Sequence, residues 1–245
     1  RVILRTVAQQ RQAEGILSQV DKSSIAEAVK LQPFLETVST ETWEKAYTTF
    51  QNQGFRSFDF FQIIVDYPQL ISRSSAKISD SLETWRSCQF GEKKVQQLLT
   101  KYPVLLDLND KQELNEKINV LRDHVSSIGN VWKLLYACPN LVNESEETIK
   151  SKFDYLTKIM RIEVSEIVRS EVLSLNLEEI KTRHVFLERL GLFKPKPLKA
   201  NPNDKSKNPK LQHIMDTSEK KFATKIAHVT LEEYEVFKEL FKREM

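Results

Sequence analysis

The sequence predicts an all-α protein, built as a curved solenoid of repeats of about 35 residues. Three observations support this fold class. Proline recurs at positions 68, 103 and 139, at intervals of 35 and 36 residues. Each of these prolines follows the same helical pattern of apolar residues at the same distance. The chain of 245 residues holds only five glycines and is rich in Leu, Lys and Glu, which favours helix over sheet.

The composition is that of an ordinary globular protein. Hydrophobic residues make up 40% and charged residues 29%, which is enough apolar material to bury a core. No apolar run approaches the roughly 18 residues expected of a transmembrane helix. The formal net charge of +3 is too small to imply nucleic-acid binding, so such a function would depend on local clusters of cations.

The N-terminal segment, residues 1–42, precedes the regular pattern, and we expect a helical cap or an irregular repeat there. The chain begins at Arg1 without a methionine, so we expect any targeting segment to have been removed already. Arg1, Arg5 and Arg11 stand near the start with no acidic residue among the first 13. This pattern fits the end of a mitochondrial transit region, and it fits a basic first helix equally well.

Each repeat is predicted to begin with a helix that carries apolar residues at i, i+4 and i+7. The five copies are Trp43-Tyr47-Phe50, Ile78-Leu82-Trp85, Leu114-Ile118-Leu121, Ile149-Phe153-Leu156 and Ile180-His184-Leu187. Asp110, Asn143 and Asn176 are each followed three residues later by Glu, the spacing of a capping box. Four glycines stand after first helices, where a left-handed residue can end a helix. They are Gly54, Gly91, Gly129 and Gly191.

A second helix, with apolar residues at i, i+3 and i+4, is closed by the recurring proline. The copies are Phe60-Ile63-Ile64, Val95-Leu98-Leu99 and Val131-Leu134-Leu135. A short 3₁₀ turn starting at the proline would place the next two apolar residues under the core. A fourth copy, Val164-Ile167-Val168, has Val172 where proline is expected, so the sequence leaves its turn open. The repeats together span residues 43–193.

The remainder of the chain changes in character. Residues 194–210 hold four of the eight prolines, six lysines and one acid, which predicts a linker. Residues 211–245 predict a C-terminal segment of two short helices, with a capping box at Thr230 and Glu233. Its apolar face either packs on the last repeat or docks a partner protein. The candidate partner-binding residues are Leu211, Ile214, Phe222, Ile226, Tyr234, Phe237, Leu240 and Phe241.

The sequence carries no pattern typical of an enzyme, a cofactor site or a metal site. Glycine loops that cradle phosphate, the G-x-S-x-G elbow and H-E-x-x-H are all missing. His184 stands on an apolar helix face, and we interpret it as a hydrogen-bonded core residue. Cys88 and Cys138 have neither disulfide nor metal spacing, so we expect two reduced, buried thiols.

Lysines and arginines supply the candidate nucleic-acid-binding residues, because contact with phosphates needs cations clustered on one face. They are Lys77, Arg86, Lys93, Lys94, Lys101, Arg122, Lys133, Lys158, Arg161, Arg169, Lys181, Arg183 and Arg189. Arg86, Arg122 and Lys158 recur every 36 residues and would form a ladder, although Lys158 is one position out of register. A solvated charged face is the alternative for each residue taken alone.

Few aromatic residues are predicted to be available for stacking on bases. Only Tyr102, Trp132 and Tyr136 stand where partial exposure is expected. This favours recognition of the shape and backbone of structured RNA over reading of a single strand.

The pattern LL-x-x-x-P-x-LL, as in Leu98-Leu99 through Pro103 to Leu105-Leu106, resembles the mitochondrial transcription termination factor family. The resemblance implies a half-ring superhelix of helix–helix–3₁₀ units, with a basic concave face that binds nucleic acid. The runs at residues 169–193 and 230–241 are most similar to the fourth metazoan member of that family.

This closer resemblance implies a non-catalytic adaptor in the mitochondrial matrix. Such an adaptor binds ribosomal RNA and the large mitoribosomal subunit, and recruits the mitochondrial Sun-domain RNA cytosine-5 methyltransferase. One alternative is a double-stranded DNA-binding regulator or terminator of mitochondrial transcription, and another is a helical scaffold that binds only protein. The candidate cations are rich in lysine, which suits phosphates better than the arginine-mediated reading of guanine, so the adaptor is preferred.

Overall fold

The computed structural model describes residues 22–197 and 207–244, and these residues form helices and no strands. The all-α helical repeat fold predicted from the sequence is therefore confirmed. Arg1, Arg5, Arg11 and the middle of the Lys/Pro-rich linker lie outside the described residues. The chain divides into two compact units, Arg1–Asn115 and Glu116–Met245. None of the described helices combines the length and apolar composition needed to cross a bilayer.

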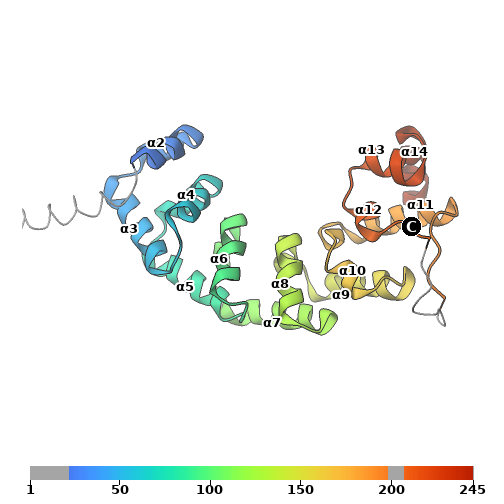
Figure 1. Ribbon diagram of the computed structural model, residues 1–245, viewed down its shortest axis with the longest axis horizontal. Coiled ribbons are helices and arrows are strands. Elements are labelled where there is room, and N and C mark those ends of the chain that lie inside the picture. The colour runs from blue at the N-terminus through green and yellow to red at the C-terminus, as the bar shows by residue number, and fades with distance from the viewer. Residues whose placement is uncertain (1–21, 198–206, 245) are drawn as a thin grey trace, which may run out of the picture. The chain divides into compact units, whose positions relative to one another are not determined.

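The first unit alternates two kinds of helix (Figure 1). The first helices of its repeats are α3 (Thr40–Asn52) and α5 (Ser75–Arg86), and the second helices are α2 (Lys22–Leu31), α4 (Ser57–Asp66) and α6 (Glu92–Lys101). Helix α2 packs on α4 and α4 packs on α6, whereas α3 packs on α5. Second helices thus form one layer and first helices the other, as expected when equivalent elements stack.

Each second helix of this unit ends in a 3₁₀ turn that begins at a proline. These turns are η1 (Pro33–Thr37), η2 (Pro68–Ser72) and η3 (Pro103–Asp107). Proline is suited to the first position, because the N–H that it lacks would have no partner inside the turn. The residue before the proline lies outside the α-helical region, with ψ of 69° at Tyr67 and 73° at Tyr102. This explains the proline in the middle of an apolar run: Leu105 and Leu106 behind it are buried.

The N-terminal segment is more regular than the predicted cap. Helix α2 carries Ile25-Ala28-Val29 with the spacing of a second helix, and Pro33 follows eight residues after the first of these. Pro33 also stands 35 residues before Pro68, and Leu35 behind it is only 1% exposed. Residues 22–37 are therefore the second half of a repeat. The signal was weak in the sequence because Glu36 replaces the second apolar residue of the turn.

The second unit continues the pattern. Its elements are α7 (Lys111–Val125, which spans the division between the units), α8 (Ile128–Ala137), η4 (Pro139–Asn143), α9 (Glu146–Asp154), the π-helical turn η5 (Tyr155–Ile159), α10 (Val164–Ile167), η6 (Val172–Ser174) and α11 (Leu177–Arg189). All fifteen residues of the i, i+4, i+7 signature are buried, with exposed fractions of 4% or less. The apolar period read from the sequence is therefore the core of every repeat.

The repeat without a proline keeps its tight turn, shortened to three residues. Val172 has an N–H that proline would lack, and this N–H donates to Oγ of the buried Ser170 at 3.1 Å. Val172 and Leu173 are both fully buried. A serine two residues earlier thus satisfies the extra donor and allows valine to replace proline.

Two predicted helix starts are confirmed and one is wrong. Oδ1 of Asp110 accepts the N–H of Glu113 at 3.0 Å, and Oδ1 of Asn176 accepts that of Glu179 at 2.8 Å. Asn143 is not a cap, because it belongs to the 3₁₀ turn η4. The cap of α9 is Ser145 instead.

One predicted glycine position is also wrong. Gly54, Gly91 and Gly191 have positive φ angles, but Gly129 lies inside α8. The left-handed residue of that repeat is Ser126, with φ of 61°. The connection therefore tolerates a polar residue with a side chain.

The C-terminal segment consists of α12 (Leu211–Met215), α13 (Glu219–Lys221), the π-helical turn η7 (Phe222–Ala227) and α14 (Leu231–Glu244). Both α12 and α14 contact α11, which is the first helix of the last repeat. The predicted capping box of α14 is confirmed. Thr230 Oγ1 accepts the N–H of Glu233 at 3.2 Å, and Glu233 Oε2 accepts the N–H of Thr230 at 2.7 Å.

Aromatic contacts fix the orientation of α14 on α11. The ring of Phe186 lies 5.0 Å from that of Tyr234 and 4.7 Å from that of Phe237, measured between centroids. The ring of Phe222 lies 5.0 Å from that of Tyr234. The apolar face of the segment therefore closes the repeat array.

This packing corrects most of the predicted partner-binding set. The buried members are Leu211, Ile214, Phe222, Tyr234 and Phe241. Ile226 and Phe237 are half-buried, and Leu240 is 53% exposed. The sequence could not separate the two uses of the face, because the same apolar stripe serves packing and docking.

Candidate nucleic-acid interface

The exposed lysines of the first unit lie at the ends of two helices. Lys77 is in the first turn of α5, Lys93 and Lys94 are in the first turn of α6, and Lys101 is its last residue. All four are exposed. Lys94 and Lys101 are seven residues apart, two helical turns, and therefore lie on the same side of α6. The Nζ of Lys101 lies 4.9 Å from the ring centroid of the half-buried Tyr102.

The three cations of the predicted ladder differ in exposure and in the partners that they contact. Arg86 is half-buried, donates from Nη2 to the backbone oxygen of Gln53 at 2.9 Å, and also bonds the side chain of Gln53. It therefore joins α5 to the end of α3. Arg122 and Lys158 belong to the second unit and are exposed, and Lys158 pairs with Asp154 at 2.9 Å. Arg122 donates to Oδ1 of Asn119 at 2.8 Å.

Arg183 is not a surface residue, which corrects its prediction as a nucleic-acid contact. The residue is only 5% exposed. Nη1 donates to the backbone oxygens of Ile214, Met215 and Thr217 at 2.8, 3.1 and 2.9 Å. A guanidinium at the C-terminus of a helix satisfies carbonyls that have no intrahelical partner and interacts well with the helix dipole. Arg183 therefore holds α12 against α11.

Two other predicted cations of α11 are engaged within the protein. Arg189 pairs with Glu244 at 2.5 Å, and its Cζ lies 5.4 Å from the ring centroid of Phe237. The hydrogen bond to Arg189 lowers the pKa of the Glu244 carboxyl. The half-buried Lys181 has its Nζ 5.8 Å from the ring centroid of Tyr155. The contacts of Arg189 attach α14 to α11, and the contact of Lys181 links α11 to η5. Both leave less of α11 available to phosphate.

The remaining predicted cations of the second unit are accessible. Lys133 on α8 and Arg169 after α10 are exposed, and Arg161 is half-buried. Within the described part of the chain, Lys77, Lys93, Lys133 and Arg169 form none of the ion pairs. The three lysines are the best candidates for contacts with the phosphates of a nucleic acid, whereas Arg169 lines the cleft described next.

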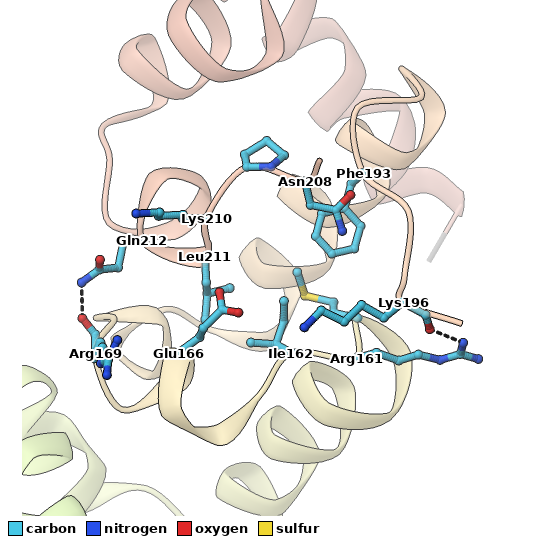
Figure 2. A pocket seen from close by; sticks show the side chains of 12 residues that line it. Arg161, Ile162, Glu166, Arg169, Phe193, Lys196, Asn208, Lys210, Leu211 and Gln212 are labelled. Atoms are coloured by element: carbon cyan, nitrogen blue, oxygen red, sulfur yellow. Dashed lines mark hydrogen bonds between the residues drawn. The ribbon is translucent and has the colours of Figure 1, made fainter. Parts of the chain in front are cut away.

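A cleft of about 470 Å³ opens in the second unit, between the α10 region and the start of the C-terminal segment. Figure 2 shows Arg169 and Lys210 on one side of this cleft, and Arg161 and Lys196 on the other. Buried Met160, Phe193 and Leu211 and half-buried Ile162 form its apolar lining. Among the described residues, Glu166 is the only acidic one of the lining.

Two of these cations have partners within the chain. Arg161 donates from Nη1 to the backbone oxygen of Lys196 at 2.5 Å. The Nζ of Lys196 lies 2.8 Å from Oε1 of Glu163, and this hydrogen bond raises the pKa of the lysine. The ends of the Lys/Pro-rich linker meet at the cleft, because the Asn208 amide bonds the backbone N–H and oxygen of Lys194 at 2.9 and 2.8 Å.

Sequence reasoning missed Lys196, Lys210 and Glu166 as site residues. The lysine-rich composition of residues 194–210 was a signal, but we interpreted this segment only as a linker. The positions at which the linker leaves and rejoins the fold are set by tertiary contacts. No sequence pattern connects Arg161 and Arg169 with a lysine about 40 residues later.

The other predicted features near the interface are found where expected. Tyr102, Trp132 and Tyr136 are half-buried, and the rings of Trp132 and Tyr136 are stacked with centroids 4.9 Å apart. His184 is 1% exposed, and its Nδ1 lies 2.8 Å from the hydroxyl of Tyr155. Cys88 and Cys138 are free and buried, and burial raises the pKa of each thiol to about 12.

Comparison with known proteins identifies relatives of the whole fold. The family model named mTERF matches residues 3–223. A mouse protein, "Transcription termination factor 4, mitochondrial", is 28% identical over 192 residues, which cover 78% of this chain and 55% of the mouse protein. The chain thus spans about half the length of this curated relative.

Proposed function

Because the chain belongs to the mTERF family, we propose that it is a non-catalytic RNA-binding adaptor of the mitochondrial matrix. In this proposal it binds ribosomal RNA and recruits an RNA cytosine-5 methyltransferase of the Sun-domain class to the large mitoribosomal subunit. Proteins of the mTERF family bind nucleic acids, and the mouse relative is mitochondrial by name. The observation that carries the proposal is the set of exposed cations on helices of a family that binds nucleic acid.

The chemistry of these cations favours contact with the nucleic-acid backbone. Lys77, Lys93 and Lys133 are exposed lysines, which act as point charges toward phosphates and are poorly suited to bidentate recognition of a base. The aromatic residues near them are half-buried, so extended stacking of single-stranded bases is not supported. Structured RNA, recognised by its shape and phosphates, fits this arrangement best.

A partner surface is proposed on the outer side of α14. Val236 and Leu240 are one turn apart on this helix and are 60% and 53% exposed. They stand apart from the aromatic face that packs on α11. We propose that the methyltransferase covers these two side chains, because exposed aliphatic residues one turn apart can serve as anchors for a partner.

RNA binding is tested by fluorescence anisotropy of a labelled RNA stem-loop titrated with the full chain at several salt concentrations. The variant K93Q/K133Q should bind more weakly, and the slope of log affinity against log salt should shrink by about 2, one for each phosphate that is no longer neutralised. The matched control is K220Q/K225Q, which removes two exposed lysines of the C-terminal segment. Equal losses of affinity in both double variants would contradict the proposed interface.

Partner binding is tested by co-elution of the full chain with the Sun-domain methyltransferase in size-exclusion chromatography. The variant V236E/L240E should abolish the complex, since it places two charges in an apolar contact. The matched control is L31E, which changes a leucine of α2 that is 61% exposed. Failure of the unaltered chain to co-elute would refute the adaptor role.

Binding of double-stranded DNA in mitochondrial transcription is the second candidate function. It is favoured by the name of the mouse relative, a transcription termination factor. The same anisotropy titration with a DNA duplex of the stem sequence distinguishes the two. Tighter binding of the DNA duplex than of the RNA stem-loop would favour the transcriptional role. A chain that binds the methyltransferase and neither nucleic acid would be a protein-only scaffold.

A further inference from the structure

We propose that the cleft beside α10 binds one nucleoside monophosphate group, with the phosphate between Arg169 and Lys210 and the base over the apolar lining. The group can be a free nucleotide or an unpaired nucleotide of an RNA strand. The cleft is separate from the lysines of α5, α6 and α8 that carry the proposed function. The part of the inference that concerns an RNA strand rests on that proposed function.

The charges of the cleft favour an anionic ligand. Its lining carries four cations and one carboxylate. Lys196 is paired with Glu163, and Arg161 uses one donor for a backbone oxygen. Arg169 and Lys210 form no ion pair among the described residues, yet they stand on the same side of the cleft (Figure 2). A phosphate dianion bound to both residues would supply the counter-charge that these two cations lack.

The lining favours a ligand that is apolar next to its charge. Met160, Phe193 and Leu211 are each 1% exposed, and Ile162 is half-buried beside them. The accessible apolar side chains of the cleft are the half-buried Ile162 and Pro209, which a base would cover and a free inorganic phosphate would leave in contact with water. The volume of about 470 Å³ lies in the range of roughly 300–1,000 Å³ that is typical of small-molecule sites.

Glu166 gives the cleft a carboxylate acceptor. It belongs to α10, next to Ile162 in the lining (Figure 2). Its carboxylate would repel a second phosphate, but it can accept a hydrogen bond from an exocyclic amine or a ribose hydroxyl. This arrangement fits a nucleoside with a single phosphate, and it fits cytidine and adenosine better than uridine.

The cleft forms where the chain folds back after the linker, and it is not a feature of the repeat unit itself. Arg161 and Arg169 come from the last repeat, whereas Lys196 and Lys210 come from the two ends of the linker. Asn208 pins these ends together through the backbone of Lys194. In the described part of the chain, the other repeats have no segment that folds back in this way, so they have no counterparts of Lys196 and Lys210.

The first experiment titrates cytidine 5′-monophosphate (CMP) into the full chain and measures binding by isothermal calorimetry. The test variant is R169Q/K210Q, in which both residues are exposed, so folding should persist. The control variant is K220Q/K225Q, which makes the same change of charge in the same unit. We expect saturable binding by the unaltered chain and the control, and a loss of at least tenfold in R169Q/K210Q. Inorganic phosphate should bind more weakly than CMP, because it cannot cover the half-buried Ile162 and Pro209.

The second experiment compares a blunt RNA duplex with the same duplex carrying one unpaired 3′ cytidine. The overhang should tighten binding of the unaltered chain, and R169Q/K210Q should lose this gain while keeping its affinity for the blunt duplex. Equal affinities for both RNAs, together with no binding of CMP, would overturn the inference and leave the proposed function intact. If no RNA binds but CMP binding is lost in R169Q/K210Q, the cleft is a free-nucleotide site and the proposed function fails instead. Binding of CMP that is unchanged in R169Q/K210Q would also overturn the inference.

Discussion

Replacing Arg183 by methionine should release the C-terminal segment from the repeats. Methionine has a similar length and fills the space beside Phe222, whose ring centroid lies 5.2 Å from Cζ of the arginine. What it removes is the donor Nη1, which serves three backbone oxygens at the end of α12. The substitution therefore separates the hydrogen bonds from the packing.

The magnitude follows from those three bonds. A buried carbonyl left without a donor costs about 1–3 kcal/mol, and the cation at the helix end contributes up to about 2 kcal/mol more. The removed desolvation penalty of the arginine offsets part of this sum. We therefore expect a net loss of about 3 kcal/mol, which corresponds to an increase of about 100-fold in local opening.

Hydrogen–deuterium exchange of the full chain measures this opening by segment. Amides of residues 211–244 should exchange about 100-fold faster in Arg183→Met, while those of residues 40–101 should be unchanged. The control Arg243→Met removes an exposed arginine of α14 and should change neither segment. Unchanged exchange at residues 211–217 would refute the role of Arg183 in holding α12. The slope of RNA affinity against salt should also be unchanged in Arg183→Met, because this buried cation does not reach solvent.

Three further predictions concern single residues of the second unit. Val172→Pro matches the repeat pattern but should destabilise the fold by about 1–3 kcal/mol in urea titration. The reason is that Glu171 has ψ of 13°, whereas a residue before proline needs an extended backbone. A stabilised variant would contradict this. Lys152→Met should lower the free energy of unfolding by about 3–5 kcal/mol, because Lys152 is 2% exposed and its Nζ lies 2.7 Å from Oε1 of Glu144. In a double-mutant cycle, the double variant with Glu144→Gln should recover part of that loss. Burial lowers the pKa of His184 from its ordinary value of 6.5, so the unfolded state binds the proton more readily. The free energy of unfolding should therefore fall as pH drops below 6.5. His184→Phe should flatten this dependence in urea titrations between about pH 5 and 8.

The local pattern of the chain was predictable because it depends on short-range rules. Apolar residues at i, i+4 and i+7 must share one helix face, and a proline after such a face must end the helix. These rules are independent of what lies further along the chain. They identified the core residues of five first helices and the tight turns at Pro68, Pro103 and Pro139. They also identified the capping box of α14.

The errors arose where two uses of one pattern differ only in long-range contacts. Asn143 has the spacing of a helix cap, but the 3₁₀ turn that it belongs to delays the helix by two residues. Arg183 has the sequence context of a surface cation, and only the return of residues 211–217 shows that it faces backbone oxygens. In both cases the competing partner lies outside the window that a local pattern can read.

The sequence by itself determined the repeat length, the helix–helix–3₁₀ unit and the residues of its core, because positions that are buried at regular intervals require apolar residues at the same intervals. Tertiary structure alone decided which cations remain available for a ligand. Arg86, Arg183 and Arg189 are engaged by neighbouring elements, whereas Arg169 and Lys210 line one side of a cleft beside the ends of the linker. Charge pairing depends on distances between elements far apart in the chain, and no local rule specifies those distances.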